Sequence, residues 1–176
     1  MSELQTILMV DDSPSNLYLM RAAFKIAKCS NPLQEARDGE EAIAYLNGDG
    51  RFGERGKFPL PSVMLLDLNM PKKNGFDVLR WVRAQPGLKR LRIVMLTASV
   101  RTEDVERAYD LGANSFLVKP IGLETLAMMM RRLVDWIEIN EFVSLHETQE
   151  VRSDYPGAGN LTADSGPSRW SALLPP

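Results

Sequence analysis

Five short runs of mostly apolar residues recur along the chain, at residues 7–10, 33–36, 63–66, 93–96 and 115–118. The first, third and fourth runs contain only apolar residues, which is typical of strands that are buried on both faces. The second run contains polar residues, so we expect a weaker strand there. This pattern predicts five strands, of which three lie deep in a sheet.

Apolar residues at helical spacing follow each run. After the first and last runs these are Leu17, Met20, Ala23 and Phe24, and then Leu126, Met130, Leu133 and Ile137. Ser13 and Pro14 suit the N-cap and first position of a helix, and Gly112 suits the end of another. Strand and helix therefore alternate five times, which predicts an α/β fold with a five-stranded parallel sheet and helices on both faces.

Two segments fall outside this alternation. Residues 49–61 combine glycine with charge and end in Pro-Leu-Pro, which predicts a surface loop that is long for its type. From about Glu147, glycine, proline and serine punctuate the chain. We therefore expect one domain over residues 5–141 and a flexible C-terminal tail over residues 142–176.

Composition narrows the class of protein. The net charge is -2, which does not favour nucleic acid as a partner. No apolar run reaches the roughly 18 residues that a membrane span needs, and the N-terminus has no signal-peptide pattern. The lone Cys29 cannot form an internal disulfide. We therefore expect a cytoplasmic protein that needs neither nucleic acid nor a membrane.

Polar residues stand where the strongest strands end. Asp11 and Asp12 follow the first strand, Asp67 follows the third, Thr97 the fourth and Lys119 the fifth. In an open parallel sheet, sites form beyond the carboxyl ends of the strands. Three carboxylates, a hydroxyl and an ammonium group are thus expected on one edge of the molecule.

This set of groups suits phosphoryl chemistry with a metal ion. Clustered carboxylates need neutralising, and Mg²⁺ takes oxygen ligands together with phosphate. Lys119 can act as a point-charge partner of phosphate, and one carboxylate can act as the nucleophile. Each residue taken singly has a simpler explanation as a turn former or helix cap, and only their convergence on one edge favours a site. The bond between Lys119 and Pro120 could adopt the cis form, which would aim Lys119 inward.

Four stretches of the sequence resemble the receiver domain of two-component response regulators, from about Gln5 to Glu138. They are Ile-Leu-Met-Val-Asp-Asp at 7–12, Leu-Leu-Asp-Leu-Asn-Met-Pro-Lys-Lys-Asn-Gly at 65–75, Leu-Thr-Ala at 96–98 and Phe-Leu-Val-Lys-Pro at 116–120. The resemblance implies the flavodoxin-like (βα)5 receiver fold. It also implies a signalling protein that accepts a phosphoryl group, not an enzyme with a separate substrate.

The resemblance assigns a role to each acidic residue. Asp67 is expected to be the phosphorylated residue and, with Asp12, a direct Mg²⁺ ligand. The main-chain carbonyl of Asn69 would be a third ligand, and Asp11 would act mostly through a metal-bound water.

Three further residues are expected to respond to phosphorylation. Thr97 would bond the phosphoryl group and move toward it, and Lys119 would bridge to the phosphate. Phe116 occupies the position of an aromatic rotamer switch, although a plain core aromatic is an equally good interpretation of this residue.

The resemblance also implies partners. The insertion at 49–61 and the single-domain layout resemble small regulators that partner phytochrome-type and related sensor histidine kinases. In these regulators the face of the fourth and fifth helices commonly pairs two chains, so the resemblance allows a homodimer through that face, and the sequence does not decide between monomer and dimer. Nothing after residue 141 suggests a DNA-binding domain, so output is expected through protein contacts.

Three alternatives remain open at this stage. An Asp-nucleophile phosphohydrolase would need an acid two residues after the nucleophile, where this chain has Asn69. A second alternative is an interaction module with the same fold that is never phosphorylated. A third is a flavin-binding protein, although Asp11 and Asp12 would repel a flavin phosphate.

Overall fold

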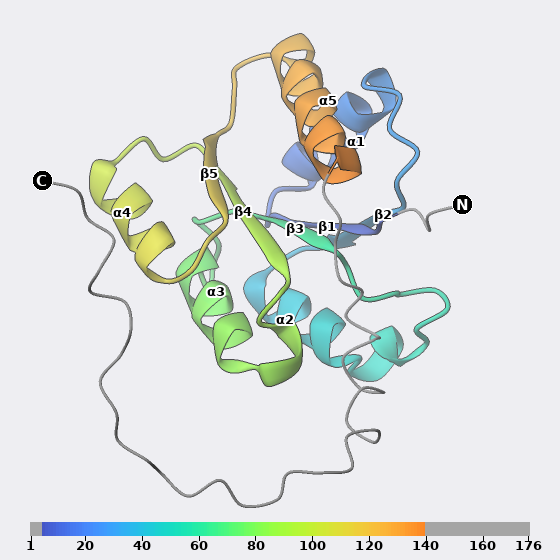
Figure 1. The fold of residues 1–176 in the computed structure, drawn as a ribbon, viewed down its shortest axis with the longest axis vertical. Helices are drawn as coiled ribbons and strands as arrows, with labels where there is room; N and C mark the ends of the chain where they lie inside the picture. Colours follow the sequence, from blue (N-terminus) through green and yellow to red (C-terminus); the bar gives the residue numbers. More distant parts are fainter. Residues whose placement is uncertain (1–4, 140–176) are drawn as a thin grey trace, which may run out of the picture.

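A computed structural model of the chain describes residues 5–139 and has a five-stranded parallel sheet at its centre (Figure 1). The strands are β1 (Ile7–Val10), β2 (Leu33–Ala36), β3 (Val63–Leu66), β4 (Arg92–Thr97) and β5 (Ser115–Val118). Their order across the sheet is β2-β1-β3-β4-β5, and every pair is parallel. The predicted five-stranded parallel sheet is thus confirmed, and β3 lies at its centre between β1 and β4.

Helices cover both faces of the sheet, as the alternation of the sequence predicts. They are α1 (Pro14–Ile26), α2 (Gly39–Asn47), α3 (Gly75–Ala84), α4 (Thr102–Asp110) and α5 (Leu123–Ile139). The helices α1 and α5 pack together on one face, and α2, α3 and α4 cover the other (Figure 1). The described part of the chain contains no helix that combines the length and the apolarity needed to cross a membrane.

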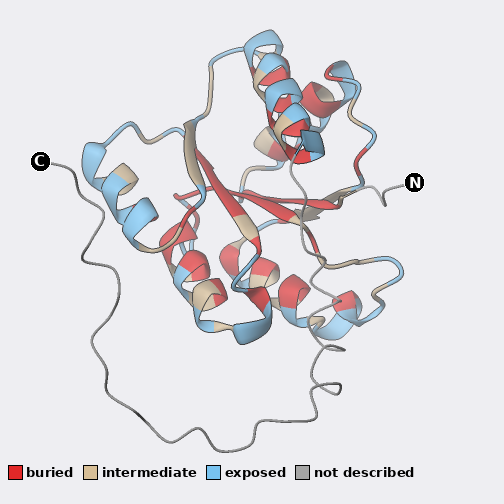
Figure 2. Cartoon of the chain, in the orientation of Figure 1, coloured by how far each residue is buried: buried red, intermediate tan, exposed pale blue. Residues whose placement is uncertain are grey.

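The sheet separates two apolar cores (Figure 2). Because side chains alternate between the faces of a strand, Leu8 and Val10 enter the core beneath α2 and α3, whereas Ile7 and Met9 enter the core beneath α1 and α5. All four residues of β1 and of β3 are buried, as the uninterrupted apolar runs predict. Both strands are therefore fixed between the two cores, and they position the residues that follow them.

Side chains at helix starts fix where the chain turns back from the sheet. The Ser13 hydroxyl accepts a hydrogen bond from the backbone N–H of Asn16, as expected of the predicted N-cap. Asn74 and Asp77 form a reciprocal capping box at the start of α3. Each cap satisfies backbone N–H groups that have no partner inside the helix.

The segment at 49–61 is more ordered than a plain loop. A 3-10 helix at Gly50–Gly53 buries Phe52, whose ring lies 5.1 Å from both Tyr45 and Phe58. The Arg55 guanidinium donates to the carbonyl oxygens of Tyr45 and Leu46 at 2.8 Å, which satisfies the last carbonyls of α2. The sequence-based expectation missed this small aromatic core, because its two phenylalanines stand alone among glycines and charges.

The expected tail over residues 142–176 lies outside the described residues. All the helices and strands of the described chain fall within the expected domain of residues 5–141.

Candidate functional site

The carboxyl ends of four neighbouring strands bring the chemical groups of the sequence together. Asp11 and Asp12 follow β1, Asp67 follows β3, Thr97 ends β4, and Lys119 follows β5. Since β1, β3, β4 and β5 are adjacent in that order, these residues meet at one edge of the sheet. The structure therefore places the five residues as their positions in the sequence predict.

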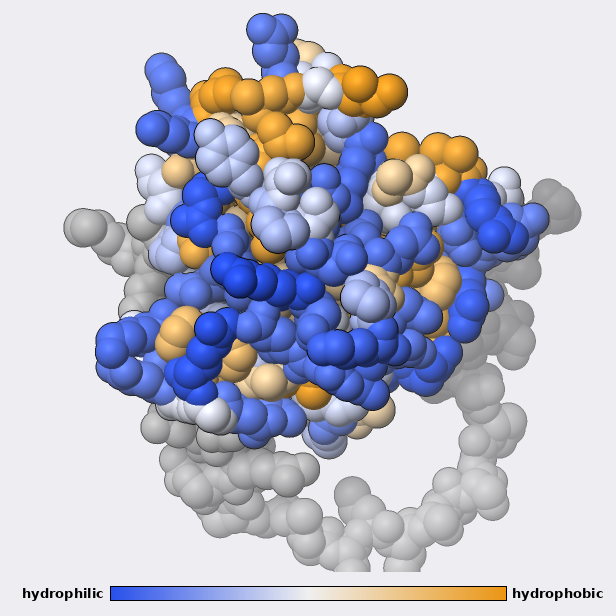
Figure 3. All heavy atoms as spheres, turned by 180° about the vertical axis from the view of Figure 1, so that it is seen from behind, coloured by the Kyte–Doolittle hydropathy of each residue, from blue (hydrophilic) through white to orange (hydrophobic). Residues whose placement is uncertain are grey.

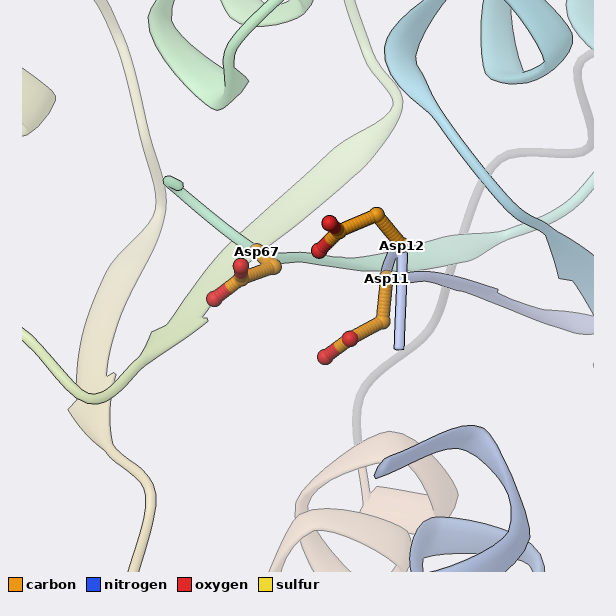
Figure 4. Close-up of side chains that lie close together, drawn as sticks. All are labelled: Asp11, Asp12 and Asp67. Carbon is orange, nitrogen blue, oxygen red and sulfur yellow. The ribbon is translucent and has the colours of Figure 1, made fainter. Parts of the chain in front are cut away.

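Three carboxylates form the acidic part of the site (Figure 4). One oxygen from each of Asp11, Asp12 and Asp67 lies within 4.8 Å of the others. Asp11 is 0% exposed and Asp67 is 6% exposed, whereas Asp12 faces solvent. The cluster is therefore a buried pair of carboxylates with one open side.

Lys119 connects the two buried carboxylates. Its Nζ lies 2.5 Å from Oδ2 of Asp11 and 2.9 Å from Oδ1 of Asp67. The ammonium group thus offsets the repulsion between the two neighbouring carboxylates. The backbone N–H of Lys119 donates to the Thr97 carbonyl at 2.8 Å, which aligns the end of β5 with the end of β4.

Lys119 reaches the site without a cis peptide bond. The described residues contain only trans peptide bonds, so the bond between Lys119 and Pro120 does not adopt the cis form that its sequence allows. Because β5 runs parallel to β4, the residue after β5 already lies at the edge of the sheet where Asp67 lies.

Burial disfavours the charged form of Asp67. Loss of solvent raises the pKa of its carboxyl group above the usual range, and the negative charge of Asp11 adds to the rise. The Lys119 ammonium acts in the opposite direction, since it stabilises the charged form. A second cation at the site would act in the same direction as Lys119 and favour the carboxylate.

Asp11 is held by groups that the sequence analysis did not identify. Its Oδ1 accepts from the backbone N–H of Ser13 at 2.9 Å and from Nδ2 of Asn16 at 3.0 Å. With the bond from Lys119 to Oδ2, both oxygens of the buried carboxylate accept hydrogen bonds. The available sequence signal was the position of Asn16, in the first turn of the helix that follows Asp11.

The remaining predicted residues lie around this centre. Thr97 is fully buried, and its Oγ1 accepts a hydrogen bond from the backbone N–H of Ser99 at 3.3 Å. Phe116 lies on β5, partly buried against the core under α2 and α3. Asn69 is exposed, two residues after Asp67.

Gly75 lets the first turn of α3 approach the site. A Cβ atom at this position would lie 2.4 Å from the carbonyl oxygen of Asp67 and 2.9 Å from Leu68 Cα. Any side chain would therefore push α3 away from the turn that carries Asp67. Gly75 ends the 65–75 stretch that carries the family resemblance, but its pattern does not reveal this close contact.

The donor set suits a hard divalent cation. Carboxylate oxygens are the ligands that Mg²⁺ and Mn²⁺ favour, and Mg²⁺ keeps several waters. The exposed side of Asp12 leaves room for such waters. Among the described residues, this is the group of acids that can hold a metal ion.

Comparisons with known proteins agree with this arrangement. The family model of the response regulator receiver domain matches residues 7–131. The response regulator Rcp1 of a Synechocystis strain is 36% identical over 135 residues, which cover 76% of this chain and 90% of Rcp1.

Two crystal structures extend the likeness to three dimensions. That of the phosphorylated cyanobacterial phytochrome response regulator RcpA has a TM-score of 0.73 and 30% identity, and the match covers 80% of this chain and 99% of RcpA. The crystal structure of the Mn²⁺-bound form of Rcp1 has a TM-score of 0.70 and 34% identity, and the match covers 80% of this chain and 99% of Rcp1. Family model, sequence relatives and fold thus all agree, and the chain belongs to the response regulator receiver domain family.

Proposed function

We propose that this protein is a signalling switch in which Asp67 accepts a phosphoryl group from a sensor histidine kinase in the cytoplasm. The observation that carries the proposal is the contact between Asp67 and the Lys119 ammonium, 2.9 Å long, beside two further carboxylates. A nucleophilic carboxylate needs such cationic neighbours, because a phosphoryl group brings its own negative charge.

In the transfer, a carboxylate oxygen of Asp67 attacks the phosphorus atom of a phosphohistidine. An O–P bond forms, the P–N bond breaks, and the imidazole of the donor leaves with the electron pair and takes up a proton. Lys119 is already bonded to Asp67, so its N–H groups can donate to the phosphoryl oxygens as they arrive.

Mg²⁺ is the proposed cofactor. Asp12, Asp67 and the main-chain carbonyl of Asn69 would bind it directly, and Asp11 would act through a bound water. The ion would neutralise charge on the phosphoryl oxygens. The Mn²⁺-bound form of Rcp1 supports a divalent ion at this site.

Two residues are proposed to transmit the change. The Thr97 hydroxyl would donate to a phosphoryl oxygen, and Phe116 on β5 would change its rotamer in response. Phosphorylation adds charge at the site, and it can shift an equilibrium between two arrangements of the chain.

The phosphodonor is proposed to be a protein of the phytochrome-type kinase class, because the related RcpA is a cyanobacterial phytochrome response regulator. Exposed apolar side chains on α1 support a protein partner, namely Tyr18 at 72%, Leu19 at 42% and Ile26 at 54% exposure. Seen from behind, apolar atoms gather at the top of the molecule, where α1 and the start of α5 lie (Figure 1 and Figure 3). A docking protein would cover these side chains while its histidine faces Asp67.

A homodimer through the α4 and α5 face is also proposed. A cavity of about 520 Å³ lies between β5 and α5, and its wall includes Leu117, Met128, Met129 and Leu133. Met128 is 60% exposed, and Tyr109 on α4 is 49% exposed. Apolar surface of this kind is suited to association with a second chain.

A phosphorylation assay tests the proposal. Acetyl phosphate with Mg²⁺ should modify the wild-type chain and shift its mobility in a phosphate-affinity gel, whereas Asp67→Asn should remain unmodified. Removal of Mg²⁺ with EDTA should abolish the reaction. Equal modification of both proteins, or of neither, would contradict a switch at Asp67 and favour an interaction module.

A further inference from the structure

The loop between β4 and α4 contains a chain of hydrogen bonds that starts at the Thr97 hydroxyl. The Ser99 backbone N–H donates to Oγ1 of Thr97 at 3.3 Å. The Ser99 hydroxyl donates to Oδ2 of Asp104 at 2.5 Å, and its oxygen accepts from the Arg101 backbone N–H at 3.4 Å. One residue thus connects the buried end of β4 to the first turn of α4.

The hydrogen bond between Ser99 and Asp104 is charge-assisted. A carboxylate only accepts hydrogen bonds, so the serine hydroxyl is the donor, and such charge-assisted bonds are shorter and stronger than neutral ones. The N-cap residue of α4, Arg101, makes no side-chain capping bond. Ser99 instead makes side-chain hydrogen bonds at the start of α4.

We propose that Ser99 and Asp104 form a latch that holds Thr97 in the arrangement of the unphosphorylated chain. The inference rests on the proposed function, and it names Ser99 as a positioning residue that acts through Thr97. When Thr97 moves toward a phosphoryl group on Asp67, it must leave the Ser99 N–H. The Ser99 hydroxyl restrains that movement because it ties the same residue to α4.

Breaking the latch should make the activated arrangement easier to reach. Beryllium fluoride with Mg²⁺ is the probe, because it mimics the phosphoryl group without a covalent reaction. Ser99→Ala removes the hydroxyl and should bind beryllium fluoride about three- to tenfold more tightly than wild type, as expected for the loss of one hydrogen bond. Ser99→Thr retains a hydroxyl and should restore wild-type affinity.

Thr102→Gly is the matched control. This substitution weakens the first turn of α4 through backbone entropy, but it leaves both latch residues in place. Its beryllium fluoride affinity should equal that of wild type. If Ser99 only stabilised α4, Thr102→Gly and Ser99→Ala would change this affinity alike. Amide exchange of Asp104 and Val105 in the free protein provides a second measurement, and it should accelerate in Ser99→Ala but not in Ser99→Thr.

The outcomes separate the latch from the proposed function. If wild type binds beryllium fluoride and Ser99→Ala binds it equally or more weakly, the latch is wrong and the phosphorylation switch stands. If Thr102→Gly tightens binding as much as Ser99→Ala does, the effect belongs to helix stability and the latch is again wrong. Failure of the wild-type protein to bind at all would overturn the proposed function itself.

Discussion

Asp67 lies in surroundings that oppose its charge. Its side chain is 8% exposed, and burial is the largest cause of its raised pKa. A carboxyl group with a raised pKa stabilises the fold only in its protonated form. That contribution is fully present below the ordinary Asp pKa of about 3.9 and is lost as the pH rises through the raised value.

Asp67→Asn should therefore stabilise the metal-free protein at neutral pH, since the amide carries no charge and can still accept from Lys119. Urea unfolding at pH 7.5 in EDTA should give a higher midpoint for the variant than for wild type. The difference should shrink as the pH falls toward 4, and also when Mg²⁺ is added to the wild-type protein. A variant that is less stable than wild type under all these conditions would show that the charge of Asp67 does not destabilise the folded protein.

Lys119 has the complementary role of supplying the counter-charge. Lys119→Met keeps the length of the side chain but leaves Asp11 and Asp67 facing each other. We expect a loss of about 3 kcal/mol in the free energy of unfolding at neutral pH, at the low end for a broken buried ion pair. Denaturant titrations should show that added Mg²⁺ recovers part of the loss. The exposed Lys73→Met is the control, and it should change stability little.

At the scale of elements, the close approach of α3 to the turn after β3 determines where Asp67 lies. Gly75→Ala introduces a Cβ that would meet the Asp67 carbonyl oxygen at 2.4 Å. We expect a loss of about 1–3 kcal/mol, as for other overpacked sites, together with slower phosphorylation by acetyl phosphate. Gly87→Ala is the matched control, because nothing lies within 4 Å of its new Cβ. Equal effects of the two substitutions would contradict the importance of this contact.

The strands and most helices could be predicted from sequence, because their patterns are strong and local. β1 and β3 are apolar throughout, and the Ser13 cap and the Gly112 turn stand where α1 begins and α4 ends. The convergence of the five site residues could also be predicted, because each of them lies at the end of a strand. These residues are Asp11, Asp12, Asp67, Thr97 and Lys119. The order of the strands, β2-β1-β3-β4-β5, was not predicted, since short apolar runs do not encode which neighbour they pair with.

Contacts between distant segments could not be predicted in the same way. The aromatic core of residues 49–61 depends on Tyr45, which belongs to α2, and on the carbonyl groups that Arg55 reaches. Ser99 has no distinguishing pattern, and its role becomes visible only through the bonds that it makes.

At the scale of the whole molecule, the site and the exposed apolar residues of α1 belong to adjacent parts of the chain. α1 starts directly after the acidic pair of β1, so a protein that covers α1 is brought close to Asp67. The apolar side chains of α1 would then contribute to recognition of the kinase and not to the chemistry.

Tyr18→Ala should slow phosphotransfer from a partner histidine kinase roughly tenfold or more, as expected when an aromatic anchor is removed from an interface. The rate with acetyl phosphate should stay at the wild-type value, because this small donor needs no docking surface. Lys57→Ala, at an exposed position of the 49–61 segment, is a control that should leave both rates unchanged. Equal slowing with both donors would show that Tyr18 supports the site and not the partner.

The small aromatic core around Phe52 lies at the end of α2, where the chain returns to the start of β3. Parallel strands place this end opposite the edge that carries Asp67, so changes of length here do not reach the chemistry. Gly56 is exposed there, and nothing lies within 4 Å of a Cβ at this position. Longer loops cost little extra closure entropy. The turn at Gly56 is therefore a natural place to graft a fluorescent or affinity module onto a working regulator.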